Sequence, residues 1–133
     1  MVSCRRAVSS CYYALFHCLA RECANLLIGG DGSDRSDEAW RQVYRSLEHT
    51  AAKDRCKHNM IHKFPKPIED FANTFVTMQD KRHQADYDPS ARFVKSSVEF
   101  DIVLVEQAIK NFKSANVKDR RAFCAYVLLK KRN

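Results

Sequence analysis

The sequence predicts an all-α protein, and three observations support this fold class. Only three Gly and three Pro occur in 133 residues, too few for a β-sandwich, whose many short strands need frequent turns. Apolar residues instead recur every three or four positions over long segments, which is the period of a helix with one buried face. No apolar run approaches the roughly 20 residues of a membrane-spanning helix. We therefore expect one domain over residues 1–133, an up-and-down bundle of four long helices plus a short C-terminal helix.

The first long helix is expected from about Ser3 to Ile28. Apolar residues line one side of it at helical spacing: Val8, Tyr12, Leu15, Leu19, Cys23 and Leu26. The segment 29–32, Gly-Gly-Asp-Gly, predicts its end, because glycine readily adopts the positive φ of a C-terminal cap.

The second helix is expected to follow Ser36 as its N-cap and to reach about Cys56. Asp37 and Glu38 fall in its first turn, where negative charge suits the helix dipole. Its buried side is formed by Trp40, Val43, Tyr44, Leu47 and Ala51. The polar segment 57–66 then predicts a connection rather than a helix.

The third helix is expected to begin at Pro67, which is suited to a first helical turn, and to end before Asp88. Its narrow apolar side consists of Ile68, Phe71, Phe75 and Met78. Asp88-Pro89 has the pattern of an N-cap followed by a first helical residue, so it predicts the start of the fourth helix. That helix carries Val94, Val98, Ile102, Val105, Ile109 and Phe112. A short fifth helix is expected from about Lys118 to Lys131.

The chain is basic, with a net charge of +7 and a pI near 9.2. This charge favours an anionic partner such as RNA, DNA or a nucleotide, and it also serves solubility. Basic residues cluster towards the C-terminus: Lys118, Arg120, Arg121, Lys130, Lys131 and Arg132. Phe123 and Tyr126 lie among them, and their helical spacing favours core packing over stacking with bases.

The cysteines indicate a reducing compartment. Cys4, Cys11, Cys18 and Cys23 all fall in the first predicted helix, where most of their side chains are too far apart to pair. Polar residues interrupt the N-terminal segment where a signal peptide needs a continuous apolar run. We therefore expect free thiols and a cytoplasmic protein without a membrane association.

Arg82 is the most informative single position. It continues the apolar side of the third helix, and an arginine there is partly buried and needs an anion, because it cannot lose its charge. Asp86 lies one turn further on, followed by Tyr87. Two interpretations remain open: Arg82 pairs with Asp86 and closes the helix end, or Arg82 contacts a phosphate.

His17 lies on a mixed side of the first helix together with small residues and Tyr13. An imidazole there could act as a general acid or base, or could be a structural histidine. Cys56, His58 and His62 form a Cys-x-His-x3-His cluster, in which a metal would need one more ligand from elsewhere and a rigid frame. We predict neither a metal nor a cofactor.

Two segments resemble one known family. The segment 5–17, Arg-Arg-Ala-Val-Ser-Ser-Cys-Tyr-Tyr-Ala-Leu-Phe-His, is similar to the RAxxxxYYAxFH opening of HEPN-domain proteins. The segment 82–88, Arg-His-Gln-Ala-Asp-Tyr-Asp, is similar to the RxxADYD segment of the same subgroup. Glu48-His49 weakly resembles that subgroup's TH position.

The resemblance implies a helical bundle that forms homodimers, binds RNA or a nucleotide and belongs to toxin–antitoxin, defence or RNA-processing systems. Many HEPN proteins are metal-independent ribonucleases that use an Arg followed four to six residues later by a His, across the dimer interface. Here Arg82 matches that Arg, but Tyr87 stands where the His is expected. A catalytic site would need His17 or His83 as the replacement, and a ligand site would comprise Arg82, Asp86, Tyr87 and Tyr13.

Three functions follow from these observations. The first is a dimeric RNA- or nucleotide-binding module without the complete ribonuclease motif. The second is an active ribonuclease that uses Arg82 with His17 or His83. The third is a structural partner, such as the companion subunit of a nucleotidyltransferase or of an antitoxin.

Overall fold

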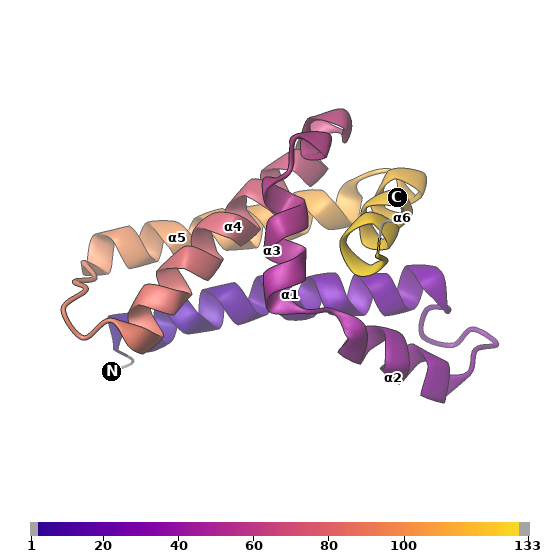
Figure 1. Cartoon of the computed structure of the whole chain (residues 1–133), viewed down its shortest axis with the longest axis horizontal. Coiled ribbons are helices and arrows are strands. Elements are labelled where there is room, and N and C mark those ends of the chain that lie inside the picture. The colour runs from indigo at the N-terminus through magenta and orange to yellow at the C-terminus, as the bar shows by residue number, and fades with distance from the viewer. Residues whose placement is uncertain (1–2, 131–133) are drawn as a thin grey trace.

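The computed structural model describes residues 3–130, and this part of the chain is all-α (Figure 1). Six α-helices and one 3₁₀ helix follow each other along these residues, without a strand. They are α1 (Cys4–Leu27), α2 (Asp37–Ser46), α3 (His49–Lys57), η1 (Asn59–Lys63), α4 (Lys66–Tyr87), α5 (Lys95–Ser114) and α6 (Val117–Leu128). No helix in the described range is both long and apolar enough to cross a membrane.

The long helices α1 and α5 extend along the long axis of the molecule, α4 runs obliquely to them, and the three pack against one another (Figure 1). The short helix α3 crosses α4, while α2 and α6 both pack on α1. The interior is rich in aromatic side chains, with Phe71 lying 4.5 Å from Phe112 and 6.3 Å from Phe123 between ring centroids. All three are fully buried, so α4, α5 and α6 share one core.

The predicted second helix is broken into two short helices, α2 and α3. The structure therefore has three long helices, of 24, 22 and 20 residues, instead of the four that were expected. Leu47 and Glu48 adopt extended backbone between α2 and α3, and the side chain of Leu47 is buried. The break lets α2 pack on α1 while α3 packs on α4 and α6. A straight helix could not reach both sets of partners.

The fourth predicted helix begins later than expected. Helix α5 starts at Lys95 rather than at Asp88-Pro89. Asp88 caps a local turn instead of a helix. Its Oδ1 accepts hydrogen bonds from the backbone N–H and the hydroxyl of Ser90, at 3.0 and 2.7 Å. The first, third and fifth helices match their predicted bounds closely, although Lys131 lies outside the described residues.

Arg5 fastens the end of α4 to the start of α1. Its two Nη atoms donate to four backbone carbonyls that follow one another along the chain, those of Ala85, Asp88, Pro89 and Ala91. The guanidinium also lies 5.5 Å from the centroid of the Phe93 ring. These contacts hold the non-helical segment between α4 and α5 against α1.

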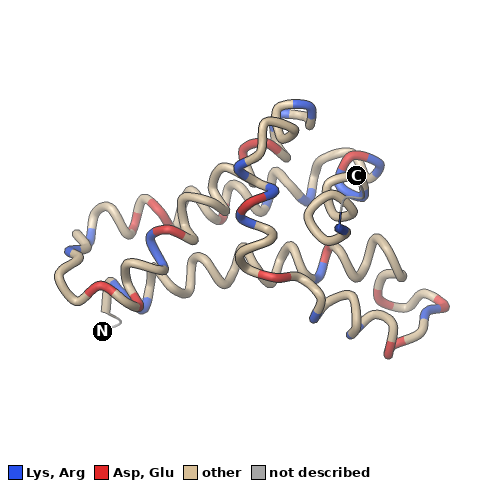
Figure 2. Tube along the Cα trace, viewed as in Figure 1, with Lys and Arg blue, Asp and Glu red and all other residues tan. Residues whose placement is uncertain are grey.

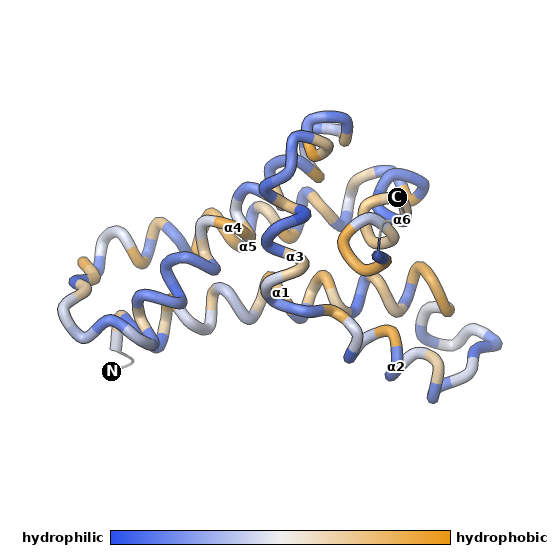
Figure 3. The backbone as a smooth tube through the Cα atoms, viewed as in Figure 1, coloured by the Kyte–Doolittle hydropathy of each residue, from blue (hydrophilic) through white to orange (hydrophobic). Residues whose placement is uncertain are grey.

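Charged and apolar residues are unevenly distributed. The middle of α1, residues 7–20, carries no Asp, Glu, Lys or Arg, and the same holds for residues 71–79 of α4 (Figure 2). Hydrophobic residues recur along α5 (Figure 3), yet several of them are exposed rather than buried: Phe100, Ile102, Val103 and Leu104.

The six cysteines are free thiols, as the sequence predicts.

Candidate functional site

Arg82 lies between α4 and α1, and its side chain is only 16% exposed. Its Nη2 donates to the hydroxyl of Tyr13 at 2.7 Å. The guanidinium also lies 5.2 and 5.6 Å from the ring centroids of Tyr13 and Tyr12, within reach of a cation–π attraction. The Arg82 side chain is therefore held by the Tyr-Tyr pair of α1.

Asp86 completes this link. Its Oδ2 lies 2.9 Å from Nε of Arg82, an ion pair in which the N–H does not point at the oxygen. Its Oδ1 accepts a hydrogen bond from the hydroxyl of Ser9 at 2.7 Å. The expected Arg82–Asp86 pair is thus present, and it connects α4 to α1 as well as closing a helical turn.

His83 and Tyr87 lie apart from these residues. Both are exposed, Tyr87 by 66%, and their rings pack on each other with centroids 4.8 Å apart. Of the predicted site residues, the structure brings together Arg82, Asp86, Tyr13 and His17. It leaves His83 and Tyr87 on the neighbouring surface of α4.

His17 joins the site through Tyr13. The two rings are one helical turn apart on α1, with centroids 6.0 Å apart and planes inclined by 28°. Nδ1 of His17 forms a hydrogen bond of 2.7 Å with the hydroxyl of Tyr44 on α2. His17 is exposed and therefore accessible to a ligand.

His49 is the site residue that the sequence did not predict. It begins α3, its ring stacks on Phe16 with centroids 4.0 Å apart, and its Nδ1 lies 2.6 Å from the hydroxyl of Tyr12. Burial lowers the pKa of His49, and the nearby charge of Arg82 and the ring of His17 lower it further. Burial also raises the pKa of Tyr12, so the hydrogen bond joins a neutral phenol to the imidazole. The weak TH-like match at Glu48-His49 was the only sequence signal for this residue.

The predicted metal-like cluster is dispersed. Cys56 is buried, which raises its pKa to about 12. Nδ1 of His58 accepts a hydrogen bond from the backbone N–H of Met60, and Nδ1 of His62 lies 3.3 Å from Glu69. Within residues 3–130 no three His, Cys, Asp or Glu side chains are grouped as metal ligands.

The C-terminal basic cluster packs as a structural element where it is described. Phe123 is fully buried, and the hydroxyl of Tyr126 donates to the carbonyl of Arg55 at 2.7 Å. Arg120 pairs with Glu22 at 3.3 Å, and Arg121 donates to the carbonyl of Leu26. Lys131 and Arg132 lie outside the described residues.

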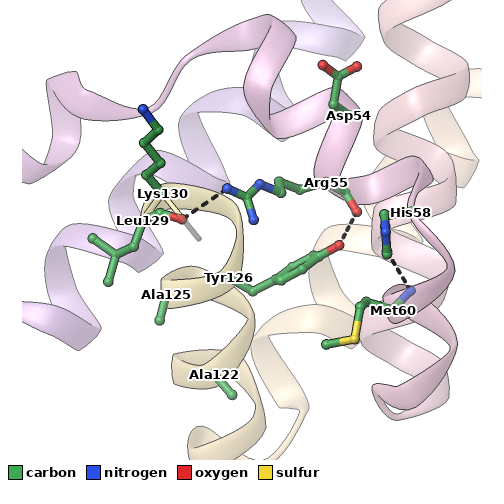
Figure 4. Close-up of a pocket in the computed structure, with 9 residues that line it drawn as sticks. All are labelled: Asp54, Arg55, His58, Met60, Ala122, Ala125, Tyr126, Leu129 and Lys130. Carbon is green, nitrogen blue, oxygen red and sulfur yellow. Dashed lines mark hydrogen bonds between the residues drawn. The ribbon is translucent and has the colours of Figure 1, made fainter. Parts of the chain in front are cut away.

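A hollow of about 610 Å³ lies between α3, η1 and α6 (Figure 4). Arg55 crosses it and donates to the carbonyl of Leu129 at 3.2 Å, and Met60, Ala122 and Ala125 supply apolar lining. None of the predicted site residues lines it. Arg55, His58 and Tyr126 are engaged with backbone groups of the protein itself, whereas the site around Arg82 brings together the residues singled out in the sequence.

Comparison of the chain with protein-family models, curated proteins and solved structures gives no match. The candidate site is a shallow aromatic cluster holding one arginine, with two histidines beside it.

Proposed function

We propose that the chain is a HEPN-like helical module that dimerises and binds RNA or a nucleotide, without the complete ribonuclease motif. One observation carries this proposal: the two segments that resemble the family meet in space although 69 residues separate Tyr13 from Arg82. The Tyr-Tyr pair, Arg82 and Asp86 are joined by the contacts described above. Because the residues of both family-like segments contact one another, they support a single binding site built from the two segments.

Binding is favoured over catalysis because no histidine replaces Tyr87 beside Arg82 on α4. His83 packs on Tyr87 and has no contact with the Arg82 cluster. Arg82 keeps part of its capacity to bind an anion, since among the described residues only Nη2 donates a hydrogen bond with good geometry. Nε of Arg82 is buried against Asp86, so a phosphate could accept only from the N–H groups of the two Nη atoms that do not bind Tyr13.

The experiment is to measure the affinity for single-stranded RNA as a function of salt. A phosphate-binding surface gives a logarithmic affinity that falls linearly with the logarithm of salt concentration. Arg82→Lys should weaken the binding and Arg92→Gln, a loss of one exposed charge on the segment between α4 and α5, should have little effect. Absent or salt-independent binding would refute the proposal and would favour the structural partner of a nucleotidyltransferase or antitoxin.

A metal-independent ribonuclease is the second candidate. The observation that favours it is the convergence of His17, His49 and Arg82 around Tyr13: the Tyr13 centroid lies 6.0 Å from that of His17 and 5.9 Å from that of His49. Two imidazoles can supply an acid and a base, and an arginine can stabilise a phosphorane-like charge. The purified protein incubated with RNA in EDTA should then cleave it, and His17→Ala should abolish the cleavage. RNA that stays intact would argue against this candidate.

Helix α5 supports dimerisation. Phe100, Val103 and Leu104 occupy one side of it at helical spacing and are 65%, 63% and 38% exposed. Contiguous exposed apolar residues are typical of protein interfaces. Charged residues flank them towards both ends of the helix, where Glu99 lies 4.0 Å from Lys95.

The test of this interface is the mass of the protein in solution. The dimer should dissociate when Val103 is changed to Glu, whereas Ser114→Glu, beyond the apolar residues on the same helix, should leave it intact. A monomeric wild-type protein would refute the dimer.

A further inference from the structure

Four aromatic side chains form a continuous strip from α1 to α2: Tyr13, His17, Tyr44 and Trp40. Successive ring centroids lie 6.0, 6.1 and 5.3 Å apart, and successive planes are inclined by 28°, 13° and 18°. Tyr13–His17 and Tyr44–Trp40 are each one helical turn apart, and the hydrogen bond between Tyr44 and His17 joins the two helices. We call these four residues the aromatic strip.

His17 and Tyr44 lie side by side rather than face to face. Two stacked rings keep their planes about 3.5 Å apart, whereas the Tyr44 hydroxyl is only 2.7 Å from Nδ1 of His17. With centroids 6.1 Å apart and planes inclined by 13°, this contact places the two rings edge to edge and nearly parallel, without overlap of their faces. Because His17 is exposed, the pair presents a flat aromatic surface on which a planar group can lie.

A hollow of about 330 Å³ borders the aromatic strip. His17 lines it, and so does Asn25, whose Oδ1 accepts a hydrogen bond of 2.8 Å from the indole N–H of Trp40. Two cations, Arg21 and Lys113, line the same hollow. The one acid in its wall, Glu22, is already paired with Arg120, so the hollow favours an anion.

We propose that the aromatic strip and this hollow bind a nucleobase together with its phosphate. The base lies on the surface formed by His17 and Tyr44, and the phosphate contacts Arg21 and Lys113. Stacking on aromatic side chains beside basic groups is how single-stranded nucleic acids are bound without sequence preference. The inference rests on the proposed function for its ligand class, but four of its residues, Trp40, Tyr44, Arg21 and Lys113, lie outside both family-like segments.

Packing of α2 on α1 accounts for part of the aromatic strip but not for all of it. Helix α2 has no fully buried residue, so the half-buried Trp40 and Tyr44 contribute to its attachment. Attachment alone does not require an exposed imidazole nearly parallel to the ring of Tyr44. Nor does it require two cations in the adjoining hollow.

Trp40 gives a local readout, since it is the only tryptophan of the chain. A base that stacks at the aromatic strip should quench its fluorescence. The full chain is titrated with AMP in one arm and with single-stranded oligoadenylate in the other. Binding of both, or of either alone, supports the proposal, and the comparison distinguishes a free nucleotide from a strand.

Matched variants separate stacking from folding. Tyr44→Leu removes the ring and should weaken oligoadenylate binding about tenfold, whereas Tyr44→Phe keeps the ring and should bind within about twofold of wild type. Arg21→Gln and Lys113→Gln should each weaken binding and reduce the salt slope by about 0.7, and Arg92→Gln should not. Circular dichroism establishes that each variant is folded.

Two results would overturn the inference. A labelled oligoadenylate could bind, by anisotropy, while Trp40 emission and the Tyr44→Leu affinity stay unchanged, in which case the inference fails and RNA binding stands. If no oligoadenylate or AMP binds, the proposed function fails together with the inference.

Discussion

Replacing Arg5 tests how strongly the end of α4 is fastened to α1. Arg5 donates to four carbonyls, of which those of Ala85 and Ala91 are partly buried and those of Asp88 and Pro89 are exposed. A bond from a charged donor contributes about 1.5 kcal/mol or more when it is partly buried and less when water can replace it. Ordering the long side chain costs about 1–2 kcal/mol. The net stabilisation is therefore about 2 kcal/mol.

Arg5→Gln should consequently lower the free energy of unfolding by about 2 kcal/mol and the Tm by about 8 °C. Arg5→Lys should recover less than half of the loss, since an ammonium group cannot span four carbonyls. Urea titration and thermal unfolding followed by circular dichroism provide the measurement.

Arg6→Gln is the matched control, because Arg6 is exposed and its replacement should change stability by less than about 0.5 kcal/mol. Equal stability of the Arg5→Gln and Arg6→Gln variants would refute the argument, since it would mean that water replaces all four bonds without loss.

Two further predictions concern buried titratable groups. The folded state lowers the pKa of His49 below its ordinary value near 6.5, so stability should be unaffected above that pH and should fall as the pH decreases through it, because the unfolded chain takes up the proton first. His49→Gln should flatten the dependence of the urea midpoint on pH between 7.5 and 5, and an unchanged slope would contradict this assignment. Burial raises the pKa of Cys18 to about 11 and that of Cys56 to about 12, so both should be alkylated at pH 8 at least about 100-fold more slowly in the folded protein than in urea. Mass spectrometry after a short exposure to iodoacetamide measures this, and equal rates in both states would show that these thiols are accessible.

The sequence predicted the elements whose signals are local. The bounds of α1 and α4 follow from an apolar side at helical spacing, a glycine segment after α1 and a proline in the first turn of α4. These features act within a few residues, so they can be recognised in the chain itself.

The start of α5 depends on a contact far away in the chain. Asp88-Pro89 has the pattern of a helix start, but the carbonyls of Asp88 and Pro89 accept from Arg5, more than 80 residues earlier. This contact, which also includes the carbonyl of Ala91, holds the turn at Pro89-Ser90 in place of a helix start. A tertiary interaction here overrides the local preference.

The candidate site could likewise be predicted only in part, because some of its residues are placed by tertiary contacts. Arg82 and Asp86 share one helix, so their pairing could be expected from their spacing. The role of His49 could not be expected, because the predicted continuous helix 37–56 gives no reason for His49 to contact the residues of α1. The break at Leu47-Glu48 places it at the start of α3, against Phe16 and Tyr12.

The charge of Arg82 determines whether the site can attract an anion, and Asp86 opposes that attraction at 2.9 Å. Asp86→Asn removes the negative charge while its side-chain oxygen can still accept from Ser9, so the link between α4 and α1 is kept. If Arg82 binds a phosphate, the variant should bind RNA several-fold more tightly and with a steeper salt dependence. If Arg82 serves only to hold α4 on α1, the variant should lose some stability and gain no affinity. The two roles of Arg82 thus predict opposite changes in RNA binding from one substitution.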